Sequence, residues 1–230
     1  MKKIKIITSI LTCLALLMCL LACSSGNAST SVPDHTVQIS ELLALVSGSY
    51  VPEDGNAVGY AASRVRGYKD VDEMFETADD VIIAKVLDKY DLFITKLDDG
   101  NEFVQTVRYI EILHSFKDFY KVGDIVPIGQ TGSTMEDGRD DAAGGVPLLK
   151  DGQSVLLFVD GDLDFTEYSD AEWAKSYACV LNSYQGKFYI DSDGTISPSR
   201  KDIGDEGAVP GSENLKNFES VFALADKHKA

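Results

Sequence analysis

Short apolar segments follow one another through the middle of the chain and predict a mainly β domain. Val81–Leu87 is a β-branched apolar run of the kind found in buried strands. Leu92–Leu97 and Phe103–Leu113 flank the turn sequence Asp98-Asp-Gly-Asn101, which predicts a hairpin. Gly129–Gly145 contains several acids among glycines and is expected to be a long loop. Further strands are expected at Ile125–Ile128, Ser154–Val159, Tyr177–Leu181 and Lys187–Ile190.

Helical periodicity occurs only at the edges of this β region. Asp70 and Glu73 have the spacing of a helix start, and Ser40 is expected to begin a short helix that ends at Gly48. Near the C-terminus an apolar stripe at helical spacing predicts an amphipathic helix packed on the strands: Leu215, Phe218, Val221, Phe222 and Ala225. These elements predict a small, closed or partly open antiparallel β-barrel with peripheral helices, formed as a single domain by residues 39–230.

The first residues have the pattern of an export signal. A basic start, Met1–Lys5, precedes the apolar run Ile6–Leu21. The segment Leu20-Leu-Ala-Cys23 resembles a bacterial lipobox, in which the cysteine becomes lipid-modified and N-terminal after cleavage. Residues 1–22 are then the signal peptide and residues 23–38 a flexible tether. The alternative is an ordinary secretory signal that leaves Cys23 as a free thiol.

Lipidation of Cys23 predicts a location on the outer face of the cytoplasmic membrane, as in Gram-positive bacteria. Two acyl chains, as in a diacylglyceryl group with its palmitate-type tails, suffice for durable anchoring. Cys13 and Cys19 leave with the signal, so only Cys179 remains in the exported domain, and an internal disulfide is impossible. The formal net charge of −16 repels nucleic acid, so the expected partners are the membrane, through the anchor, and an unknown envelope protein or ligand.

Several segments together resemble a group of uncharacterised small β-barrel domains in secreted and lipid-anchored proteins of Gram-positive bacteria, which are similar to OB-fold and netrin-like barrels. The matching segments are Phe75–Val86, Val122–Asp124, Pro147–Phe158 and Gln185–Phe188. The resemblance implies an OB-like fold and carries over no catalytic residues. The amino-terminal disulfide cysteines of netrin-like protease inhibitors are absent here, which argues against an inhibitor.

Few residue sets point to catalysis. The histidines are His35, in the predicted tether, His114, beside a strand, and His228, near the end. A histidine-based zinc site or a Ser-His-Asp triad would have to use His114 or require the ends of the chain to fold inward. No nucleophile elbow, phosphate-binding loop or dinucleotide fingerprint occurs. Paired acids are abundant, so a carboxylate-dependent hydrolase of envelope substrates is the alternative function.

Two residue groups are candidate binding sites. Asp160, Asp162 and Asp164 alternate as in the start of an EF-hand loop, but Phe165 and Ala171 stand where that loop needs glycine and glutamate. A looser Ca²⁺ site, completed by Asp140 and Asp141, competes with a plain solvated acidic loop. The aromatic candidates for a ligand face, for which core packing is the alternative, are Tyr168, Trp173, Tyr177 and Tyr184. The predicted function is non-catalytic binding at the cell envelope.

Overall fold

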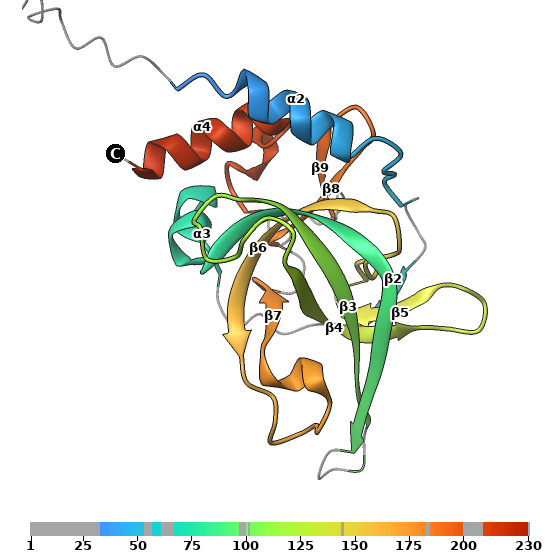
Figure 1. Cartoon of the computed structure of the whole chain (residues 1–230). Coiled ribbons are helices and arrows are strands. Elements are labelled where there is room, and N and C mark those ends of the chain that lie inside the picture. Colours follow the sequence, from blue (N-terminus) through green and yellow to red (C-terminus); the bar gives the residue numbers. More distant parts are fainter. Residues whose placement is uncertain are drawn as a thin grey trace, which may run out of the picture. The chain divides into compact units, whose positions relative to one another are not determined.

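The computed structural model confirms a mainly β chain with helices at its periphery (Figure 1). It describes residues 33–52, 57–60, 67–96, 100, 102–143, 145–182, 185–199 and 209–229. The chain divides into residues 1–34 and 35–230, and every element named below belongs to the second unit. No helix among the described residues is both long and apolar enough to span a membrane. In chain order the elements are α2 (Thr36–Leu45), β1 (Ala57–Tyr60), α3 (Val71–Thr77), β2 (Asp80–Lys96), β3 (Glu102–Ser115), β4 (Ile125–Thr134), β5 (Asp140–Ala143), β6 (Ser154–Leu163), η1 (Glu172–Lys175), β7 (Tyr177–Val180), β8 (Lys187–Ile190), β9 (Ile196–Pro198), η2 (Ser212–Asn214) and α4 (Phe218–Lys229).

Five strands close into a ring at the centre of the sheet. Its order is β4-β3-β2-β6-β7, and β7 pairs back with β4. The β4/β7 pair is parallel, as is the β1/β5 pair outside the ring. The predicted purely antiparallel arrangement is therefore wrong. A ring with an odd number of strands cannot alternate direction all the way round, so at least one neighbouring pair must be parallel.

The predicted hairpin is present. Its first arm, however, belongs to the same strand as Val81–Leu87, which the sequence pattern predicts as a separate strand. β2 runs without interruption through both apolar segments. Its pairing register with β3 shifts between Val86 and Tyr90, opposite the Ile110–Arg108 segment. Such bulges bend a strand. The first part of β2, Asp80–Lys85, also pairs with β6, which places it inside the sheet.

Alternate residues of the central strands face two different cores, which explains their nearly continuous apolar runs. Ile82 and Ala84 point into the ring and join side chains from all five ring strands. Their neighbours Val81 and Ile83 point outward and pack under the helices. β6 divides in the same way, with Leu157 in the ring and Leu156 on the helix side.

Two predictions about the peripheral helices are confirmed: the start of α3 at Asp70 and the apolar stripe of α4. Asp70 caps α3, because its carboxylate accepts a hydrogen bond from the backbone N–H of Glu73 at 2.9 Å. The apolar stripe around α4 is buried throughout, from Leu215 at 4% exposure to Ala225 at 1%. α2 begins at Thr36, upstream of the predicted cap at Ser40 and within the span predicted as tether. In Figure 1, α2 and α4 lie side by side on one end of the sheet, and His35 stacks on Phe222 of α4.

The prediction of one long loop over Gly129–Gly145 is wrong. Its first part belongs to β4, and Asp140–Ala143 forms β5, which pairs with the end of β4. Gly132 permits this hairpin to close tightly. Its φ is +125°, and a Cβ at this position would lie 2.2 Å from the backbone oxygen of Asp141.

Candidate functional site

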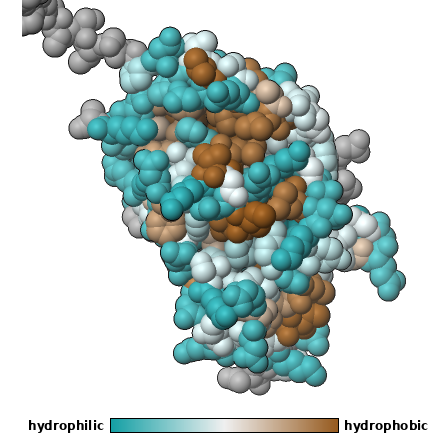
Figure 2. All heavy atoms as spheres, viewed as in Figure 1, coloured by the Kyte–Doolittle hydropathy of each residue, from teal (hydrophilic) through white to brown (hydrophobic). Residues whose placement is uncertain are grey.

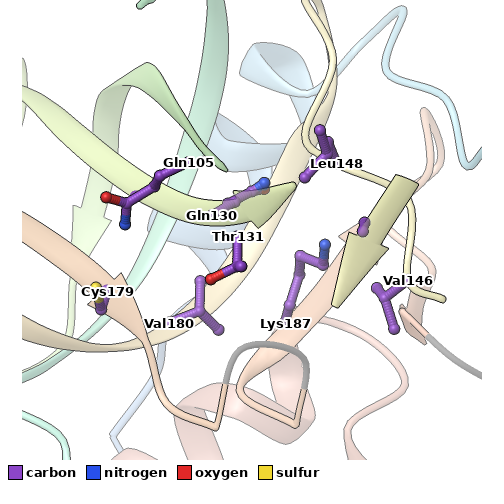
Figure 3. A pocket seen from close by; sticks show the side chains of 10 residues that line it. Gln105, Gln130, Thr131, Val146, Leu148, Cys179, Val180 and Lys187 are labelled. Atoms are coloured by element: carbon purple, nitrogen blue, oxygen red, sulfur yellow. The ribbon is translucent and has the colours of Figure 1, made fainter. Parts of the chain in front are cut away.

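A small polar pocket opens beside β4, where this strand lacks a neighbour on one side. β7 pairs with β4 only at Ile128 and Gly129, and β5 takes over at Gly132. No described strand pairs with Gln130 and Thr131 on that side. The resulting gap is a pocket of about 60 Å³, which is enough for a few heavy atoms. We call it the Lys187 pocket; its polar lining is formed by Gln105, Gln130, Thr131, Cys179 and Lys187, and Leu148 lies at its edge (Figure 3).

Among the described residues that line this pocket, Lys187 is the one with a charged side chain. It stands at the start of β8 opposite Leu157, on the same face as the ring core, and is 3% exposed. Its ammonium donates a 2.6 Å hydrogen bond to the carbonyl oxygen of Pro147. Burial lowers the pKa of Lys187 to about 7, although the charge of Asp140 partly opposes this shift. Lys187 therefore loses much of its preference for the charged form through burial.

The segment Val146–Lys150 forms the outer wall of the pocket and is held by hydrogen bonds to its backbone. The backbone N–H of Leu148 donates to Asp140 at 2.8 Å, and that of Leu149 donates to Gln130 Oε1 at 2.9 Å. The Pro147 carbonyl accepts from Lys187 and, at 3.2 Å, from the Tyr189 hydroxyl. The wall is thus fixed from β4, β5 and β8, and the pocket is largely preformed.

Asp140 is the buried acid behind this wall. Its carboxylate is 1% exposed and also accepts hydrogen bonds from the Thr134 hydroxyl and the Lys150 ammonium. A wider cavity of about 300 Å³ adjoins it, lined among others by Tyr50, Pro147 and Lys150. The Asp140–Lys150 pair therefore faces this wider cavity, and Lys187 faces the smaller pocket.

Two glutamines present polar atoms to the Lys187 pocket without satisfying them. Gln130 Nε2 and Gln105 Oε1 are buried and have no hydrogen-bond partner among the described residues. The amide of Gln130 has a defined orientation, because the N–H of Leu149 requires the oxygen on its side. Figure 3 shows the nitrogen ends of Gln130 and Lys187 toward Leu148, with the Gln105 amide and Cys179 at the other side of the pocket. Buried polar atoms left in this way favour a polar occupant.

Cys179 contributes a thiol of low reactivity. Burial raises the pKa of Cys179, so the thiol stays protonated at neutral pH. Burial also raises the pKa of the adjacent Tyr177 hydroxyl, which forms a hydrogen bond with Gln105. The chemistry of the pocket is therefore that of hydrogen-bond donors and one buried cation, which can hold an acceptor or an anion.

The predicted calcium residues do not converge. Asp162 accepts a hydrogen bond from the Ser176 hydroxyl at 2.7 Å, and Asp164 from the Thr166 hydroxyl at 2.7 Å. Burial, followed by the charge of Asp79, raises the pKa of Asp160. Asp140 is committed to its own buried contacts, and Asp141 lies beside it in β5. Within the described residues no group of three or more Asp, Glu, His or Cys side chains is arranged to hold a metal ion.

The predicted aromatic ligand face is divided by the structure. Trp173 and Tyr177 are buried at 6% and 7% exposure in a cluster with Phe93 and Phe165. Tyr168 is 60% exposed and packs against Phe165 in a tilted arrangement with ring centres 4.7 Å apart. Tyr184 lies outside the described residues. Of the two buried rings only Tyr177 approaches the Lys187 pocket, through its contact with Gln105.

The three histidines, which are far apart in the sequence, all contact helices or rings at one end of the sheet. His228 Nε2 donates a 2.9 Å hydrogen bond to the Asp72 carboxylate, and His35 Nε2 donates one of 2.9 Å to the Asp226 carboxylate. His114 packs between Phe116 and Phe222, with ring centres 4.5 and 5.1 Å away. Both ends of the chain that the structure describes thus fold inward, but the histidines bind acids and aromatic rings of the fold.

His114 predicts a specific pH dependence of stability. Burial, aided by the charge of Lys229, lowers the pKa of His114 below its ordinary 6.5. The unfolded chain therefore binds the proton more readily than the folded chain. The contribution of neutral His114 to stability is full above pH 6.5 and is lost as the pH falls through the lower folded-state value. Urea unfolding from pH 7.5 to 5 should show the free-energy difference between His114→Phe and wild type changing in favour of the variant at low pH. A pH-independent difference would contradict this assignment.

Two pocket residues escaped the sequence analysis, although one left a signal. Lys187 stands at an inward position of a strand whose other residues, Phe188–Ile190, are all buried. A lysine in such a strand is rare and marks a buried charge. Gln130 carries no comparable signal, because it lies in the segment Gly129–Gly145, whose glycines and acids predict a loop. Asp140 was singled out as an acid but assigned to calcium.

Comparisons with known proteins name no family for this chain. No protein-family model matches it, and no curated protein matches it significantly. The resemblance to small OB-like domains of Gram-positive lipoproteins therefore stays a prediction. The residues of the Lys187 pocket are the basis for inferring a function.

Proposed function

We propose that this protein is a lipid-anchored extracellular lipoprotein that acts as a non-catalytic binding module at the cell envelope. In this proposal Cys23 attaches the chain to the outer face of the cytoplasmic membrane, and the five-strand ring serves as a small OB-like barrel. The observation that carries the proposal is the preformed Lys187 pocket, in which buried donors and an acceptor face space rather than protein partners.

Three features of the pocket support binding over turnover. Its wall is fixed by hydrogen bonds from three strands, as suits recognition by a rigid site. The thiol and the phenol that approach it, Cys179 and Tyr177, have raised pKa values and stay protonated. The nearest buried carboxylate, Asp140, is committed to Thr134, Leu148 and Lys150.

Site-specific photo-crosslinking in living cells tests this proposal. A photoreactive amino acid replaces Thr131, a half-buried residue of the pocket lining, in the full-length lipoprotein. The matched control carries the same group at Glu219, an exposed position on α4. We expect mass spectrometry to find a recurrent adduct at position 131 that is absent at 219 and lost when Lys187→Met is added.

Two outcomes would contradict the proposal. Equal adducts at both positions would show that the pocket recognises nothing in the envelope. Conversion of the captured molecule by the purified lipoprotein, with loss of turnover in the Lys187→Met variant, would show that the module is an enzyme.

A further inference from the structure

The buried charges around the Lys187 pocket do not balance. Asp140 forms an ion pair with Lys150, whose side chain is 28% exposed. Lys187 is more deeply buried, and no described carboxylate lies within ion-pair distance of it. One buried carboxylate thus lies near two ammonium groups and pairs with only one of them, Lys150. A buried ammonium without an anion is costly, and the site must either release the proton or acquire a negative partner.

Two donors are placed to hold such a partner. Lys187 has three N–H groups, and within the described part of the chain its hydrogen-bond acceptor is the Pro147 carbonyl. Gln130 Nε2 lines the same pocket and has no partner among the described residues, while its Oε1 is held by Leu149. Figure 3 shows both nitrogen ends on the Leu148 side of the pocket. An ammonium and an amide NH₂ together match the two oxygens of a carboxylate.

We propose that the Lys187 pocket binds a small carboxylate, one oxygen pairing with the Lys187 ammonium and the other accepting from Gln130 Nε2. The pocket volume of about 60 Å³ limits the occupant to a carboxylate group with a few further atoms. The carboxylate belongs either to a free short acid or to the end of a larger molecule. This inference rests on the proposed binding function and names the chemistry that the pocket recognises.

The other titratable groups near the pocket make Lys187 the one that changes charge near neutral pH. The pKa values of Cys179 and Tyr189 are raised by burial, so both stay neutral. The charge of Asp140 favours protonated Lys187 and that of Lys150 opposes it. Because a carboxylate requires the ammonium form, its apparent affinity should weaken by about tenfold per pH unit well above pH 7.

The test is a titration of the purified full-length lipoprotein in detergent, with lysine side chains labelled with ¹³C. Acetate is added at pH 6.5 against sodium chloride of equal ionic strength. We expect saturable movement of the Lys187 ¹³Cε resonance and a rise of the unfolding temperature with acetate only. N-acetylglycine, whose carboxylate sits on a larger body, and its amide form a second arm. Binding by acetate alone identifies a free short acid, and binding by N-acetylglycine but not its amide identifies a carboxylate end.

Gln130→Glu supplies the anion from within the chain. Glutamate keeps an oxygen for the N–H of Leu149 and places the second oxygen where Nε2 stood. We expect this variant to be more stable than wild type, to keep Lys187 protonated at higher pH, and to lose its response to acetate. Lys187→Met should also lose the response while remaining folded by circular dichroism.

Absence of any acetate effect in wild type, or an effect that persists in Lys187→Met, would overturn the carboxylate site. So would a Gln130→Glu variant that is destabilised and still responds to acetate. These results do not test the binding function, which the photo-crosslinking experiment tests separately. A specific adduct at position 131 without an acetate response would reject the carboxylate site and leave the binding function standing.

Discussion

Replacing Asp140 by alanine should lower the free energy of unfolding by about 3–5 kcal/mol, as removal of one partner from a buried ion pair does. Asp140 is 1% exposed and accepts hydrogen bonds from Thr134, Leu148 and Lys150. The variant leaves the N–H of Leu148 without its acceptor inside the protein. It also removes the negative charge nearest to both Lys150 and Lys187.

Urea unfolding of the purified protein measures this effect as a shift of the midpoint at unchanged m value. Asp137→Ala is the matched control, because Asp137 lies in the same hairpin, is about half exposed and forms its ion pair and hydrogen bonds with Arg139. An exposed pair of this kind contributes little to stability. If both variants shift the midpoint equally, Asp140 does not hold the pocket wall.

Replacing Cys23 by alanine should abolish acylation and with it the durable attachment to the membrane. The lipobox-like segment ending at Cys23 provides the only thiol at the predicted cleavage site. Cells fed an alkyne analogue of palmitate should label the wild-type protein and not the variant. Cleaved variant protein should then appear in the culture medium, because neither acyl chain remains to hold it.

Cys19→Ala and Cys179→Ala provide the controls, since one lies in the signal and the other in β7. Both variants should keep the label. Palmitate label that persists in Cys23→Ala would place the modification elsewhere and overturn the assignment of the anchor. Label that is absent from wild type would favour the alternative of an ordinary secretory signal.

Local chemistry was enough to predict two of the peripheral helices, α3 and α4. The Asp70 cap depends on residues three positions apart, and the α4 stripe repeats at the helical period, so both patterns act within a few residues. The apolar runs at Val81–Leu87 and Ser154–Val159 likewise predicted buried strands. Their residues alternate between two cores, so nearly every position in these runs must be apolar, whichever core it faces.

The candidate site could not be predicted in the same way, because it depends on where strands stop. The Lys187 pocket exists because β7 covers only two residues of β4 before β5 begins. Gln130 and Lys187 are far apart in the chain and meet only across this gap. The alternating acids show the converse, since the spacing suggested one site but Asp162 and Asp164 have separate hydrogen-bond partners.

The sequence by itself determined the β-rich class and the capped and amphipathic helices, while lipid attachment at Cys23 stays a prediction. Each of these follows from residue type and spacing over short distances. Only the tertiary structure decided that five strands close a ring through a parallel β4/β7 pair, and that a buried lysine faces a gap beside it. Strand direction and pairing are set by contacts between residues distant in sequence, and short-range patterns do not encode which strand will be the neighbour.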